Sequence, residues 1–123
     1  GDYYTIDPTT GQSTQIGEYG TYGSSGDLVY VRGAGTFATA TSTSHGTDVL
    51  VAVNAGTGQA TLIGETGFSS IWGLAYWGGT IYGFTDFGEF ITIDPATGQG
   101  TLVEATSYSF WGAGVTTTAP IVQ

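Results

Sequence analysis

The sequence DPATGQ at residues 94–99 decides the fold, because two variants of it occur earlier in the chain. They are DPTTGQ at residues 7–12 and NAGTGQ at residues 54–59, so the three copies lie 47 and 40 residues apart. Asp or Asn caps such a turn through its side chain, Pro sets φ at the next position, and Gly accepts the left-handed conformation. Each copy is therefore predicted to form the turn of a β-hairpin.

Short runs rich in β-branched and aromatic residues flank every copy of this turn, as the two strands of a hairpin require. The runs that precede the turns are residues 3–6, 49–53 and 90–93, and those that follow them are residues 13–16, 60–63 and 101–103. The chain is therefore expected to contain three hairpins of one design.

A second repeated element follows each hairpin and adds two more strands to the repeat. It is clearest as SIWGLAY at residues 70–76 and SFWGAGV at residues 109–115, with a divergent copy, DLVYV, at residues 27–31. Gly78-Gly79 and Asp86-Phe87-Gly88 are turn signals. In the best copy the four strands are predicted at residues 72–77, 80–85, 89–93 and 101–104. A four-stranded meander that recurs about every 40 residues is typical of a β-propeller blade.

The composition agrees with an all-β protein of one domain. The chain has 123 residues, and Gly and Thr contribute 22 each, which disfavours helices and favours strands joined by tight turns. Ten acidic residues stand against one basic residue, Arg32, and the net charge is −9. Phosphate binding needs clustered cations, so nucleic acid is excluded as a partner. The longest wholly apolar run, residues 49–53, is far shorter than the roughly 20 residues of a membrane-spanning helix, so no membrane span is predicted.

Two stretches resemble the repeat of bacterial β-propellers related to the NHL, YVTN and TolB-like groups. They are TIDPATGQGTLVE at residues 92–104 and WGLAYWGGTIYGF at residues 72–84. The resemblance covers nearly the whole chain, and it implies the propeller fold rather than an activity, because these groups include binding, scaffolding and a few enzymatic members. Two features depart from the pattern: Asn54-Ala55 replaces Asp-Pro, and a longer loop rich in Thr and Ser enlarges the middle blade.

The whole chain, residues 1–123, is predicted to be half of a propeller. Two strands at residues 1–18 are followed by full blades at about residues 27–64 and 71–105. Two further strands follow at about residues 109–123, the first at residues 110–115 and the second at residues 117–123. The total is three blades, whereas known propellers have roughly 4 to 8. We expect a homodimer that closes one six-bladed ring by sharing two blades between chains. The alternatives are an open fibre built by the same strand exchange, and a fragment of a longer propeller completed by a different polypeptide.

The resemblance also implies that the loops between blades share one face of the disc with the loops between second and third strands. Aromatic residues and the single imidazole of the chain occur in loops of this face. The candidate ligand-binding residues are Trp72, Trp111, Tyr22, Tyr108 and His45. Aromatic platforms beside acids suit carbohydrate, although for both tryptophans we favour packing between blades, because Trp is mostly a packing residue.

Acidic residues in loops of the same face indicate a second kind of site. The candidate calcium ligands are Asp86, Glu89, Asp48 and Asp2. An excess of carboxylates favours oxygen-ligated cations, and the alternative is that the acids only maintain solubility.

Ser42, His45 and Asp48 lie close together in the sequence and have the side chains of a nucleophile, a base and an acid. Their spacing matches no catalytic motif, and a single His in a polar loop is more often a solvated side chain. No enzyme activity is predicted.

The sequence therefore favours a non-catalytic propeller module that acts by self-assembly and by interaction or adhesion. An extracellular or cell-surface location is expected from the low charge and the high content of Thr and Tyr. The alternative function is that of a lectin-like propeller, which binds carbohydrate through its aromatic loop face.

Overall fold

The computed structural model describes residues 1–116, 118 and 120, and all regular structure in this part of the chain is β-strand. Ten antiparallel strands form a two-stranded hairpin and two four-stranded sheets. The hairpin consists of β1 (Asp2–Ile6) and β2 (Ser13–Glu18). The central sheet has the order β3 (Gly23–Val31), β4 (Gly35–Thr41), β5 (Val49–Val53) and β6 (Ala60–Glu65). The last sheet contains β7 (Ile71–Trp77), β8 (Thr80–Thr85), β9 (Glu89–Ile93) and β10 (Gly100–Ala105), also in chain order.

The three repeated sequences form hairpin turns, as predicted. In each turn the side-chain oxygen of the first residue accepts a hydrogen bond from the backbone N–H two residues later. The distance is 2.8 Å at Asp7, 2.9 Å at Asn54 and 2.8 Å at Asp94. The Gly in the fifth position has a φ between 72° and 78° in all three turns. At the first turn these backbone donors hold the pKa of the Asp7 carboxyl below its ordinary value.

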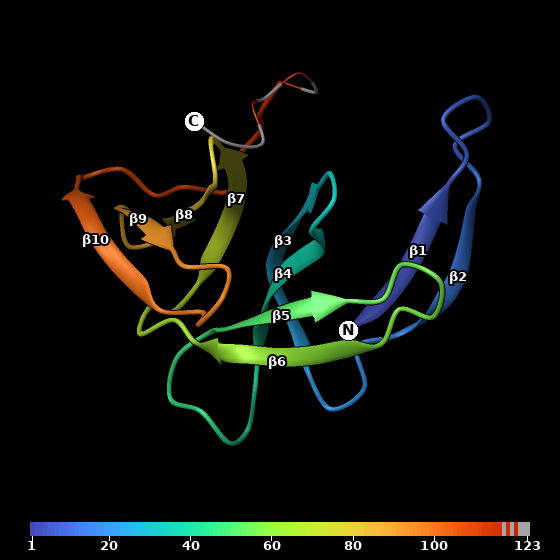
Figure 1. The fold of residues 1–123 in the computed structure, drawn as a ribbon, viewed down its shortest axis with the longest axis horizontal. Helices are drawn as coiled ribbons and strands as arrows, with labels where there is room; N and C mark the ends of the chain where they lie inside the picture. The colour runs from blue at the N-terminus through green and yellow to red at the C-terminus, as the bar shows by residue number, and fades with distance from the viewer. Residues whose placement is uncertain (117, 119, 121–123) are drawn as a thin grey trace.

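The hydrophobic core lies between neighbouring sheets rather than within one of them. Figure 1 shows the hairpin, the central sheet and the last sheet side by side in chain order. Side chains alternate between the two faces of a strand. Val49, Val51 and Val53 of β5 pack toward the hairpin, while Leu50 belongs to the cluster shared with the last sheet. Each junction thus buries one face of each of the two sheets that meet there.

The hairpin leaves apolar side chains exposed where the other two sheets bury them. Tyr4 is 46% exposed and Ile6 is 67% exposed, whereas the equivalent residues of β5 and β9 are at most 6% exposed. In the central and last sheets, β5 and β9 pair with β4 and β8. Among the described residues β1 pairs only with β2. The outer side of β1 is therefore an open strand edge next to exposed apolar residues.

The strand predicted at residues 110–115 is not formed, because residues 106–116 lie outside any strand. The segment nevertheless runs along β7: a Cβ added to Gly73 would lie 2.7 Å from the carbonyl carbon of Gly112. Among the described residues, its one backbone hydrogen bond to a strand runs from the N–H of Phe110 to the carbonyl of Thr85, at 3.2 Å. A strand needs a neighbour that pairs with its backbone groups along its length, and no strand in the described part of the chain pairs with this segment in that way. Most of the last predicted strand, residues 117–123, lies outside the described residues.

The prediction of an all-β protein built from four-stranded antiparallel sheets is confirmed. The ten described strands of a single chain do not close a ring, so the six-bladed ring stays a prediction. None of the described residues belongs to a helix that could cross a membrane.

Candidate functional site

A polar pocket of about 370 Å³ opens beside the β4–β5 and β6–β7 connections. Seven hydroxyl side chains line it together with an imidazole, a carboxylate and an indole. They are Ser24, Ser25, Thr41, Ser42, Thr47, Ser69 and Ser70, with His45, Asp48 and Trp72. The structure therefore brings together three of the candidate ligand-binding and calcium-binding residues, namely His45, Asp48 and Trp72.

Glu65, the last residue of β6, holds the loop that carries His45. Its carboxylate accepts hydrogen bonds from the N–H of Gly46 at 3.1 Å, and from the N–H and hydroxyl of Thr47 at 3.2 and 3.0 Å. These bonds, led by that of the Thr47 hydroxyl, hold the pKa of the Glu65 carboxyl below its ordinary value. Sequence reasoning missed Glu65, because its partners lie 18 and 19 residues earlier and no local motif marks the contact.

Asp48 has a structural role at the floor of this pocket. It is only 4% exposed, and its carboxylate accepts hydrogen bonds from the Ser25 hydroxyl and, at 2.9 Å, from the backbone N–H of Ile71. Its own carbonyl accepts a hydrogen bond from the backbone N–H of Thr66 at 2.9 Å. Asp48 thus ties β3 and β7 to the start of β5.

The other three candidate metal ligands lie on different elements. Glu89 accepts a hydrogen bond from the Thr85 hydroxyl at 2.8 Å, Asp2 accepts one from the side-chain amide of Gln15 at 3.4 Å, and Asp86 lies in the β8–β9 turn. In the described part of the chain, no group of three or more His, Asp or Glu side chains is placed to hold a metal ion. We therefore propose no calcium site.

Ser42, His45 and Asp48, the residues considered above as a nucleophile, a base and an acid, lie near one another but do not form a relay. His45 Nδ1 lies 3.1 Å from Ser42 Oγ. The Asp48 carboxylate is bonded to other groups, namely the Ser25 hydroxyl and a backbone N–H. A catalytic triad needs the acid to orient the base, and this contact is not among the hydrogen bonds of the described residues.

The aromatic residues of the predicted loop face divide into two groups. The ring centroids of Trp72 and Trp111 are 4.6 Å apart, with 59° between the ring planes. Trp72 is half-buried, so packing explains its position, as favoured from the sequence. Trp111 is 75% exposed, so packing within this chain does not explain its position. Tyr108 is exposed as well. Tyr22, in contrast, packs against the cluster between the hairpin and the central sheet.

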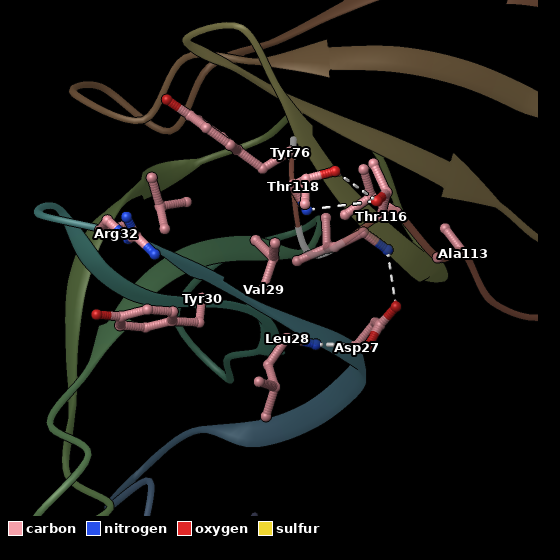
Figure 2. Close-up of a pocket in the computed structure, with 13 residues that line it drawn as sticks. Asp27, Leu28, Val29, Tyr30, Arg32, Tyr76, Ala113, Thr116 and Thr118 are labelled. Atoms are coloured by element: carbon pink, nitrogen blue, oxygen red, sulfur yellow. Dashed lines mark hydrogen bonds between the residues drawn. The ribbon is translucent and has the colours of Figure 1, made fainter. Parts of the chain in front are cut away.

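A second cavity, of about 640 Å³, lies between β3, β7 and residues 113–116 and 118, as Figure 2 shows. Asp27 joins two of these walls, because its carboxylate accepts a hydrogen bond from the N–H of Leu74 at 3.0 Å. Arg32 is exposed on the cavity wall, and it is the only Arg in a sequence that has no Lys. A guanidinium there can bind a carboxylate or phosphate through two hydrogen bonds. Sequence reasoning noted this residue for its charge but missed its place, because separate segments form the wall.

Comparison with protein-family models and with curated proteins finds no match for this chain. The resemblance to propeller repeats therefore stays a sequence prediction.

Proposed function

We propose that the chain is a non-catalytic interaction module, which assembles with a second copy of itself to complete a β-propeller. The observation that carries this proposal is the exposure of Tyr4 and Ile6, at positions where β5 and β9 bury their side chains. Exposed apolar residues beside an unpaired strand edge favour association with another chain. In the proposed assembly, residues 110–122 of the second copy supply the missing strands beside β1.

The outer face of the last sheet supports the choice of a second copy as the partner. The isoleucines of β8 and β9 point into the junction with the central sheet, so the alternate residues Tyr82, Phe84 and Phe90 point the other way. Their rings stack, with centroids 5.7 Å apart for Tyr82 and Phe90 and 5.1 Å apart for Phe84 and Phe90. All three are only half-buried. Within the chain each sheet covers this face of the sheet that precedes it, so the hairpin of a second copy would bring Tyr4 and Ile6 onto the aromatic face.

In solution the protein is expected to have twice the 12.6 kDa mass of one chain. Changing Tyr4 and Ile6 together to Asp should raise the dissociation constant about a hundredfold, since each carboxylate would have to lose its water in the contact, at ~1–3 kcal/mol each. Size-exclusion chromatography with light scattering over a dilution series measures both quantities.

The matched control for this experiment is Phe87→Asp. Phe87 is 69% exposed, like Ile6, but it lies in the β8–β9 turn and outside the proposed contact. This variant should associate as the unmodified chain does. If the unmodified chain keeps a mass of 12.6 kDa in solution and melts cooperatively, self-assembly is refuted.

Carbohydrate binding is a second candidate function, favoured by the polar pocket beside Trp72. An indole at the rim of a pocket lined by hydroxyl groups offers both stacking and hydrogen bonding to a sugar. We expect neutral oligosaccharides to change the tryptophan fluorescence in a saturable way, and we expect His45→Ala to weaken binding about tenfold, ~1.4 kcal/mol. Tyr30→Ala, in the other cavity, is the control. Fluorescence that no sugar changes would exclude this candidate.

A further inference from the structure

The two junctions inside the chain share a close backbone contact. The second hairpin turn rests on Gly17 of β2, and the third rests on Gly64 of β6. A Cβ added to Gly17 would lie 2.9 Å from the carbonyl carbon of Thr57, and one added to Gly64 would lie 3.1 Å from that of Thr97. In both cases the carbonyl oxygen would be closer still. A side chain at either position would therefore push the turn away.

Glu104 occupies the same position in β10. Gly17, Gly64 and Glu104 each come directly after the residue that the register shift of their hairpin leaves unpaired. The third copy of the repeat thus has a Cβ and a carboxylate at the point where the turn of a following sheet would rest.

The first hairpin turn, residues 7–12, is the turn that a second copy would bring to Glu104. It has the same Thr-Gly pair as the other two turns. Nothing lies within 4 Å of a Cβ built on Gly11, whereas a Cβ built on Gly58 or Gly98 would lie 3.0 or 2.8 Å from a backbone carbon of the glycine beneath it. The first turn is therefore docked on nothing among the described residues.

We infer that Glu104 determines the strength of the contact between copies, and that it makes this junction looser than the two inside the chain. The inference rests on the proposed self-assembly. Glycine at this position would allow the first turn of the second copy to approach as closely as the internal turns do. Any Cβ holds the turn at a greater distance, and the carboxylate adds a further like charge between two chains of net charge −9.

The test compares Glu104→Gly with Glu104→Ala, Glu104→Gln and Thr101→Gly by analytical ultracentrifugation over a dilution series. The dissociation constant of Glu104→Gly should be at least tenfold lower than that of the unmodified chain, a change of ~1.4 kcal/mol. The Ala and Gln variants keep the Cβ and should change it less than threefold. Thr101→Gly places a glycine at an exposed position of the same strand and controls for the loss of a side chain from β10.

The outcomes separate this inference from the proposal on which it rests. If the unmodified chain dimerises and Glu104→Gly has the same dissociation constant, the role of Glu104 alone is overturned. A dissociation constant of Glu104→Gln as low as that of Glu104→Gly would also overturn it, because the charge and not the Cβ would then determine the strength of the contact. If neither the unmodified chain nor Glu104→Gly associates, self-assembly itself is wrong and the inference falls with it.

Discussion

Replacing Asp48 by Ala is expected to lower the free energy of unfolding by about 3 kcal/mol. The carboxylate accepts hydrogen bonds from the Ser25 hydroxyl and from the N–H of Ile71, and Ile71 is fully buried. Without the carboxylate this N–H loses the acceptor that it has in the folded protein. Urea unfolding followed by tryptophan fluorescence measures the loss, at a fixed protein concentration because association would add to the apparent stability.

Two other variants, Asp48→Asn and Asp86→Ala, should lose less stability and serve as comparisons. Asp48→Asn keeps one side-chain oxygen as an acceptor, so it should lose roughly half as much stability, since bonds to a charged acceptor are about twice as strong as neutral ones. Asp86→Ala changes a partly exposed carboxylate in a turn and should stay within about 0.5 kcal/mol of the unmodified chain. Equal stabilities of Asp48→Ala and Asp86→Ala would mean that the bonds to Asp48 hold nothing in place.

Local turn chemistry explains why most of the fold could be predicted from the sequence. The predicted strand at residues 49–53 coincides with β5, and that at residues 80–85 coincides with β8. Both strands end at turns whose conformation depends on Gly or on a side-chain cap within a few residues. Repetition then transfers the assignment from the clearest copy to the others.

The strand predicted at residues 110–115 shows the limit of this reasoning. The resemblance of Phe110-Trp111-Gly112 to Ile71-Trp72-Gly73 is local, and the segment does lie against Gly73. Pairing is not local, because a strand exists only where another strand offers its backbone groups. The neighbour that β7 finds in β8 has no counterpart among the described residues.

The candidate site was predictable as a collection of residues and not as a set of contacts. His45, Asp48 and Trp72 do meet in one pocket. The partners that decide what Asp48 does lie 23 residues away in each direction, and no spacing rule connects them. A comparison of the three copies of the repeat could have found Glu104, since Gly17 and Gly64 occupy its place in the other two.

Gly64→Ala is expected to destabilise the protein by about 3 kcal/mol, at the upper end of the range for overpacking, with a fall in Tm of roughly 10 °C. The added methyl would lie 3.1 Å from the carbonyl carbon of Thr97 and closer to its oxygen. These are backbone atoms of a turn that is itself constrained, because Gly98 has a φ of 78° and lies against Gly64. The turn can yield only by moving away from β6, which would open the junction between the central and last sheets. Thermal unfolding by circular dichroism measures the change.

Gly46→Ala is the control that separates the close contact from the general effect of removing a glycine. No atom lies within 4 Å of a Cβ built on Gly46, and its φ is not positive. Losing glycine there restricts the unfolded chain and should leave stability unchanged or raise it by up to about 1 kcal/mol. If Gly64→Ala proves as stable as Gly46→Ala, the turn gives way without cost. The Cβ of Glu104 would then be no obstacle between copies either, so this measurement on the junction inside the chain also bears on the contact between chains.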